Sequence, residues 1–164
     1  MKQGLMKVAA AAPRIRVADT DYNAKALVEC AKRASKEKVG VLVFPEMSMT
    51  AYTANDLLFF DTLLRGAEEG LAYYIEQTKD LPMLSFVGVP VCAFGRIYNC
   101  AAAVSQGELL GLVPKYALGN YGEFNESRWY AHPMDDTVEF TFAGQDTYLG
   151  TDLIFCCEEM SMIL

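Results

Sequence analysis

Residues 40–46 read Gly40-Val41-Leu42-Val43-Phe44-Pro45-Glu46. Their unbroken apolar run is typical of a strand that is covered on both faces of a sheet. Before it, residues 21–38 carry an apolar stripe at helical spacing, behind a capping residue at Asp19 or Thr20. A further short apolar stretch, residues 6–12, precedes that helix. Strand, helix and strand in this order predict a right-handed crossover.

Beyond this strand the sequence favours a second helix and then a series of strands. An apolar stripe predicts the helix over residues 56–78. The strands expected after it are residues 84–91, 98–104, 109–113, 138–142 and 147–157. The turn residues Gln106-Gly107 join two of these strands into a hairpin. The whole order predicts one α/β domain whose sheet turns antiparallel in its middle.

Composition limits the classes of protein to which the chain can belong. Its 164 residues contain 14 Lys and Arg against 21 Asp and Glu, a net charge of −7, so we expect neither nucleic acid nor a membrane as partner. No apolar run approaches the ~20 residues of a transmembrane helix. Hydrophobic residues make up 52% and charged residues 21%, which excludes a disordered chain. The high apolar share hints at a buried interface, as in a homo-oligomer, or at a missing piece of the protein.

The cysteines indicate a reducing compartment. They are odd in number and lack zinc-ligand spacing: Cys30, Cys92, Cys100, Cys156 and Cys157. No export signal precedes them, so reduced thiols and a cytoplasmic location are the simplest expectation. We expect no disulfide framework and no metal site.

Glu46 is the first candidate for chemistry. It follows the apolar strand directly, and ligand sites of α/β sheets lie at the carboxyl ends of strands. A carboxylate walled by Phe44, Met47 and Tyr52 would lose solvation and could act as a base near neutral pH. The alternative interpretation is an exposed or helix-capping glutamate in a loop.

Lys115 is the second candidate. It follows Leu112-Val113-Pro114 at a strand end and opens a loop rich in aromatic residues. A lysine there can supply fixed positive charge where an oxyanion develops. Glu123, eight residues on, could pair with it and keep it charged. The alternative is a surface lysine whose stem packs on apolar neighbours.

A family resemblance rests on motifs that occur in a characteristic order. They are Lys7-Val8-Ala9-Ala10-Ala11, Phe44-Pro45-Glu46-Met47-Ser48, Tyr98-Asn99-Cys100-Ala101-Ala102, Gly111-Leu112-Val113-Pro114-Lys115, Asn120-Tyr121-Gly122-Glu123-Phe124-Asn125-Glu126 and Gly150-Thr151-Asp152-Leu153-Ile154-Phe155. From about Lys7 to its last residue the chain resembles the amino-terminal glutaminase domains of glutamine-dependent NAD synthetases. These belong to the nitrilase, or carbon–nitrogen hydrolase, superfamily. The resemblance implies an α/β fold, the nitrilase-like αββα sandwich.

The resemblance also implies a Glu–Lys–Cys catalytic triad. It places the glutamate at Glu46 and the lysine at Lys115, and it makes Glu123 a second carboxylate beside the lysine. Tyr121 falls where NAD synthetases contact glutamine. Further pocket residues implied in the same way are Tyr52, Phe124 and Glu126.

The third member of the triad is harder to place. In the family the nucleophilic cysteine ends a later strand, which Met162-Ile163-Leu164 would begin, so we expect it beyond residue 164. Cys157, followed by Glu158-Glu159, is the alternative. Residues 1–164 are therefore expected to be one carboxy-terminally truncated domain, inactive by itself and self-associating through uncovered strands.

The activity that the resemblance implies is hydrolysis of the glutamine side-chain amide. The ammonia would pass to a synthetase domain of the parent chain, a ligase that uses ATP and Mg to amidate nicotinate adenine dinucleotide to NAD. The glutaminase domain itself needs no cofactor. Two other functions stay open: a stand-alone nitrilase-type amidase, and a non-catalytic binding or scaffold protein.

Overall fold

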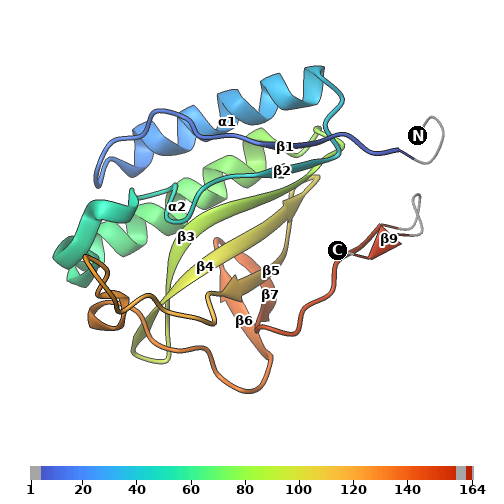
Figure 1. The fold of residues 1–164 in the computed structure, drawn as a ribbon. Coiled ribbons are helices and arrows are strands. Elements are labelled where there is room, and N and C mark those ends of the chain that lie inside the picture. Colours follow the sequence, from blue (N-terminus) through green and yellow to red (C-terminus); the bar gives the residue numbers. More distant parts are fainter. Residues whose placement is uncertain (1–4, 158–161, 164) are drawn as a thin grey trace.

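Two helices cover one face of a mixed seven-stranded sheet in the computed structural model, which describes residues 5–157 and 162–163 (Figure 1). The elements are β1 Val8–Ala10, α1 Thr20–Lys36, β2 Val41–Val43, the 3₁₀ segment η1 Tyr52–Phe59, α2 Asp61–Gln77, β3 Leu84–Ala93, β4 Arg96–Ser105, β5 Glu108–Pro114, the 3₁₀ turn η2 Glu126–Arg128, β6 Val138–Phe142, β7 Gln145–Leu149, β8 Cys156–Cys157 and β9 Met162–Ile163. Neither helix of these residues is long and apolar enough to cross a membrane.

The strand order of the sheet is β1-β2-β3-β4-β5-β7-β6. Strands β1, β2 and β3 run parallel, whereas β4 is antiparallel to both β3 and β5. The predicted α/β fold with an antiparallel middle is thus confirmed. Because β5 runs in the same direction as β2, the carboxyl ends of these two strands lie at the same edge of the sheet.

Helix α1 forms where the sequence predicts it. Asp19 is its N-cap, and its side chain accepts a hydrogen bond from the Tyr22 N–H at 3.1 Å, which satisfies one of the free donors of the first turn. The apolar stripe of the helix is buried against α2 and the sheet; its members include Ala24, Leu27, Val28 and Ala31. This packing fixes the helical layer behind β1–β4.

The second predicted helix begins later than expected. Instead of one helix from residue 56, the chain forms η1 and then α2, which starts at Asp61. The reason is local: Asn55 has a positive φ of 49°, and Phe60 is extended. The break leaves Tyr52 and Asp56 on a separate short segment, which is free to face the sheet edge rather than the helical layer.

The last predicted strand is also shorter than expected. It ends at Leu149 rather than at residue 157. The Gly150 N–H donates to the Leu112 carbonyl, but the next ladder bond would need an N–H from Pro114, which proline lacks. The chain then leaves β5, and Phe155 packs on Phe86 with ring centroids 5.7 Å apart. The expected self-association stays a prediction.

Candidate functional site

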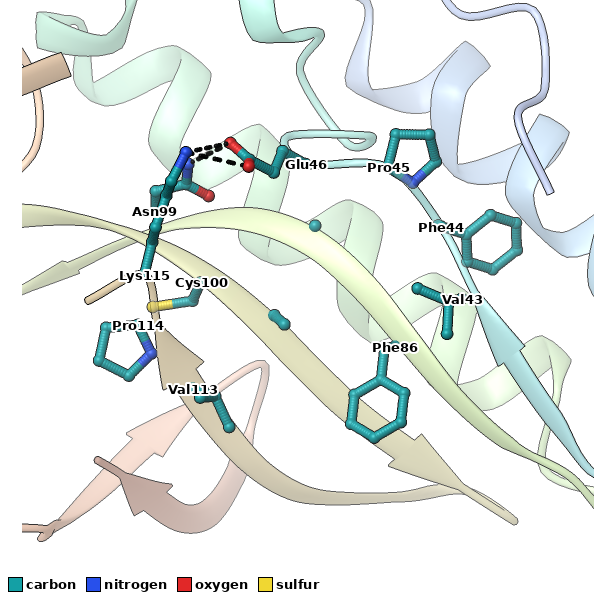
Figure 2. A pocket seen from close by; sticks show the side chains of 12 residues that line it. Val43, Phe44, Pro45, Glu46, Phe86, Asn99, Cys100, Val113, Pro114 and Lys115 are labelled. Carbon is teal, nitrogen blue, oxygen red and sulfur yellow. Dashed lines mark hydrogen bonds and ion pairs between the residues drawn. The ribbon is translucent and has the colours of Figure 1, made fainter. Parts of the chain in front are cut away.

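Glu46 and Lys115 lie together at the shared carboxyl edge of β2 and β5 (Figure 2). The Nζ atom of Lys115 lies 3.0 Å from Oε1 and 3.1 Å from Oε2 of Glu46. The two residues are 69 positions apart in the sequence. Each follows its strand closely, so the parallel direction of β2 and β5 brings them to the same place.

The turn that carries Glu46 is anchored on Gly88 of β3. The Met49 N–H donates to the Gly88 carbonyl at 3.0 Å, and the Gly88 N–H donates to Ser48 Oγ at 3.2 Å. A Cβ atom at position 88 would overlap the Pro45 carbonyl oxygen. Only glycine therefore allows the turn to lie directly on the strand. Sequence reasoning missed this residue, although a glycine inside an apolar strand is a known sign of close backbone approach.

Asn99 on β4 is a second residue that sequence reasoning missed. The side-chain Nδ2 group of Asn99 donates to Glu46 Oε2 at 3.0 Å. The backbone carbonyl of Asn99 accepts a hydrogen bond from the Lys115 backbone N–H at 2.7 Å. Asn99 therefore contacts both members of the pair. The available sign in the sequence was a polar residue within the apolar run that forms β4.

Glu126 is the second carboxylate on Lys115. Its Oε1 lies 2.9 Å from Lys115 Nζ and accepts a hydrogen bond from the Tyr52 hydroxyl at 2.7 Å. Oε2 accepts from the Gly119 N–H. The side chain is only 2% exposed. Burial alone would raise the pKa of Glu126, but the hydrogen bonds from Gly119, Lys115 and Tyr52 outweigh burial and lower its pKa.

Lys115 is held as a cation between the two carboxylates. Burial alone would lower its pKa, but the hydrogen bonds to Glu126 and Glu46 outweigh burial and raise it. The side chain is 30% exposed, so it remains accessible from the pocket. A fixed ammonium group at this position can stabilise an anion that forms beside it.

Two expectations about the carboxylates are wrong. Glu123 is exposed and makes no ion pair among the described residues, and Glu126 occupies the place beside Lys115. The chain turns at Gly122, where φ is +58°, and η2 then directs Glu126 inward. Glu46 is also not desolvated: its side chain is 48% exposed, because Phe44 and Met47 are buried in the core instead of covering it.

The aromatic loop after Lys115 is tied to η1 by a clamp around Asp56. Arg128 donates to both carboxylate oxygens at 2.9 and 2.8 Å, and Trp129 Nε1 donates to Oδ1 at 2.8 Å. The bonds from Arg128 and Trp129 lower the pKa of Asp56 to about 2. The clamp holds together the two segments that carry Tyr52 and Glu126.

An open pocket of about 280 Å³ adjoins the pair (Figure 2). Its apolar lining includes Val43, Phe86 and Val113, and Glu46, Asn99 and Lys115 are its polar residues. On the loop side, the rings of Tyr52, Phe124 and Tyr121 form an edge-to-face row. The predicted contact of these three residues and of Glu126 with a substrate stays a prediction.

Thiols are the remaining candidates for chemistry. Cys100 borders the pocket but is 1% exposed, and burial raises the pKa of its thiol far above the ordinary value. Cys156 is exposed in β8, whose partner β9 lies on the opposite side of the molecule from η1 (Figure 1). The side chain of Cys157, the alternative nucleophile, lies outside the described part of the structure. Among the described residues, no group of His, Cys, Asp and Glu is arranged to hold a metal ion.

Comparison with known families gives one match that spans almost the entire chain. The family model described as carbon-nitrogen hydrolase matches residues 7–162. The glutamine-dependent NAD(+) synthetase of Mycobacterium tuberculosis (strain ATCC 25618 / H37Rv) is 31% identical over 159 residues, which are 97% of this chain and 23% of that protein. The same enzyme of Acinetobacter baylyi is 32% identical over 138 residues, 84% of this chain and 25% of that protein. The chain therefore spans about a quarter of the length of these relatives.

Solved structures extend the comparison. A glutamine-dependent NAD(+) synthetase from Cytophaga hutchinsonii superposes with a TM-score of 0.81 at 26% identity, covering 94% of this chain and 26% of that one. A mutant of an amidase of the nitrilase superfamily from Nesterenkonia superposes with a TM-score of 0.66 at 18% identity, covering 87% of this chain and 54% of that one. The second likeness concerns the fold alone. Together they confirm the expected nitrilase-like α/β fold.

Proposed function

Because the chain belongs to the carbon–nitrogen hydrolase family, we propose that the pocket of Glu46 and Lys115 is the acid–base part of a glutamine amidohydrolase site. The observation that carries this proposal is the ion pair at 3.0 Å between two strand-end residues, at the mouth of a pocket. The relatives of this chain are described as glutamine-dependent NAD(+) synthetases, which supports glutamine as the substrate of this site.

In the proposed mechanism Glu46 moves protons and Lys115 balances charge. Glu46 takes the proton of a cysteine thiol while the sulfur bonds to the amide carbon, and the ammonium group of Lys115 stabilises the resulting oxyanion. The C–N bond then breaks, and Glu46 gives its proton to the departing ammonia. Water loses a proton to Glu46, bonds to the carbon of the thioester and displaces the thiolate, which takes back that proton as glutamate leaves.

Three groups hold the pair in this arrangement. Glu126 fixes the far side of Lys115 and is itself saturated with donors, so it serves as the permanent counter-charge. Tyr52 donates to Glu126, and Asn99 donates to Glu46. Since Glu46 remains accessible, it is the carboxylate that can exchange protons with a reactant. Glu123 has no part in this arrangement.

The nucleophile is proposed to come from a strand that follows residue 164 in the parent protein. This is supported by the described thiols: Cys100 lines the pocket but is buried, and burial raises the pKa of its thiol, whereas Cys30, Cys92 and Cys156 do not line the pocket. Residues 1–164 would then be the amino-terminal part of a glutaminase domain that hands ammonia to a synthetase region. That region would use it, with ATP and Mg, to amidate nicotinate adenine dinucleotide.

The test is ammonia release from glutamine by the full-length protein. We expect release that falls by a factor of about 10² or more in Lys115→Met, because the oxyanion loses its counter-charge. Lys25→Met, which removes an exposed lysine paired with Asp21, is the matched control and should leave the rate unchanged. Residues 1–164 by themselves should release no ammonia.

Two results would contradict the proposal. A folded full-length protein that releases no ammonia from glutamine would instead favour a binding or scaffold role. Release by residues 1–164 alone that is abolished by Cys157→Ala would place the nucleophile at the alternative position.

A further inference from the structure

Asn99 is the one polar side chain of the pocket, besides Lys115, that bonds to Glu46 within the described residues. It lies on β4 directly between the two partner strands, opposite Pro90 of β3. The backbone carbonyl of Asn99 accepts a hydrogen bond from the Lys115 N–H at 2.7 Å, which continues the β4–β5 ladder. The amide and the ammonium group thus approach Glu46 from neighbouring positions of one sheet edge, as Figure 2 shows.

Asn99 and Glu46 differ in how firmly the fold holds them. Asn99 is 4% exposed and is fixed by strand pairing on both sides, whereas Glu46 lies on a turn and is 48% exposed. A donor on a rigid strand that bonds to an exposed carboxylate restricts the orientation of that carboxylate. The Asn99 side-chain amide must turn its NH₂ group toward the Glu46 carboxylate, because the carboxylate would repel the amide oxygen.

The donors are distributed unequally over the two oxygens of Glu46. Oε2 accepts from both Asn99 and Lys115, at 3.0 and 3.1 Å, while Oε1 accepts from Lys115 alone among the described residues. An oxygen that already accepts two hydrogen bonds is the poorer site for a proton. Oε1 is therefore the oxygen left to receive a proton from a reactant and to return it.

We propose that Asn99 is a positioning residue that selects Oε1 of Glu46 as the proton-carrying oxygen. The inference rests on the proposed function of Glu46 and adds a residue to it. No atom of Asn99 gains or loses a bond in the reaction; its amide keeps donating to Oε2 while Oε1 takes up and gives back the proton. The charged and titratable groups that surround Glu46 are Lys115, Glu126, Tyr52 and Tyr130.

The experiment compares Asn99→Leu and Asn99→Asp in the full-length protein. Both remove the donor, and the second adds a like charge. We expect kcat to fall about 10- to 100-fold with little change in KM, as for loss of a hydrogen bond to a charged group. The acidic limb of the pH profile of kcat/KM should move to higher pH, and further for Asn99→Asp, because both changes disfavour the ionised carboxylate.

The matched control is Asn23→Ala. Asn23 is a fully buried asparagine that bonds to the Arg16 and Met49 carbonyls and makes no contact with the pair. It should lower the melting temperature and leave the pH profile in place. Asn99 variants that lose stability in the same way, with a pH profile that superimposes on that of the unmodified protein, would overturn the proposal.

A second measurement keeps this result separate from the proposed function. In protein labelled with ¹³C-glutamate, the Glu46 carboxyl signal can be assigned with Glu46→Gln and titrated without any turnover. Asn99→Asp should move that titration to higher pH, because it places a like charge beside the carboxylate. If the unmodified protein releases no ammonia, the proposed function fails, and an unmoved midpoint in Asn99→Asp would show separately that Asn99 does not act on Glu46.

Discussion

Lys115 separates two carboxylates that the protein treats in opposite ways. Glu126 is 2% exposed and receives hydrogen bonds from a lysine, a tyrosine and a backbone N–H. Glu46 is 48% exposed and faces the pocket. The difference indicates a division of roles. A buried, saturated carboxylate serves as a permanent counter-charge, and an accessible one can exchange a proton.

The largest expected effect is the loss of activity on substitution of Glu46, the accessible carboxylate. Glu46→Gln in the full-length protein should lower kcat for ammonia release from glutamine by about 10²- to 10⁴-fold, the usual contribution of a general acid–base. Its stability should change little, because the Lys115–Glu46 pair is partly exposed and Lys115 keeps Glu126. Steady-state kinetics and thermal denaturation measure the two quantities. A variant with normal turnover would remove Glu46 from the mechanism.

Substitution of Glu126, the buried carboxylate, should affect stability more and activity less. Glu126→Gln should lower the free energy of unfolding by about 1–3 kcal/mol, because the buried, charged acceptor of three hydrogen bonds is lost. We expect a smaller fall in activity than for Glu46→Gln, since Lys115 is displaced but not removed. Glu123→Gln is the matched control and should change neither quantity, because Glu123 is exposed. An effect of Glu123→Gln as large as that of Glu126→Gln would restore the original assignment of the second carboxylate.

A still smaller loss of stability is expected when the Tyr52 hydroxyl, which donates to Glu126, is removed. Tyr52→Phe removes the 2.7 Å hydrogen bond to Glu126 and should cost about 1–2 kcal/mol of stability. Tyr74→Phe is a suitable control, because the buried Tyr74 hydroxyl has no hydrogen-bond partner among the described residues, so its removal should be neutral or stabilising. Denaturant unfolding of both variants checks this. Equal losses would mean that the bond to Glu126 contributes nothing.

The smallest effect is a gradual loosening of the aromatic loop in acid. The folded-state pKa of Glu126 lies below its ordinary value of 4.5, so its contribution to stability is present above that pH and is lost as the pH falls through the lowered value. The Asp56 clamp follows as the pH approaches about 2. Trp129, the only tryptophan, bonds to Asp56, so its fluorescence should report both changes.

The control for this acid titration is Asp56→Asn, which should remove the change at the lowest pH and leave the one near Glu126. If fluorescence of the unmodified protein stays constant from pH 5 to the global unfolding transition, the two carboxylates do not hold the loop in the way the hydrogen bonds indicate.

The same contrast explains how much could be predicted from sequence. Glu46 and Lys115 each follow an apolar strand, so the local pattern predicted that each lies at a strand end, whereas their meeting in one site was implied by the family resemblance. The cap of α1 at Asp19 and the Gln106-Gly107 turn were predictable for the same reason. Local pattern decides each of these features.

The features that were missed depend on contacts between distant segments. Spacing from Lys115 suggested Glu123, but the turn at Gly122 and the hydrogen bond from Tyr52 bring Glu126 inward. Gly88 matters only because a turn from another strand lies on it, and Asn99 only because Glu46 is above it. No periodicity in the sequence encodes such contacts.

The most direct test of the central claim is a double-mutant cycle of Glu46→Gln and Lys115→Met, read as kcat/KM for glutamine in the full-length protein. Residues that act as one unit are not additive, so we predict that the double variant is no slower than the slower single variant. Losses that multiply, with each substitution lowering the rate by the same factor in either background, would contradict the account.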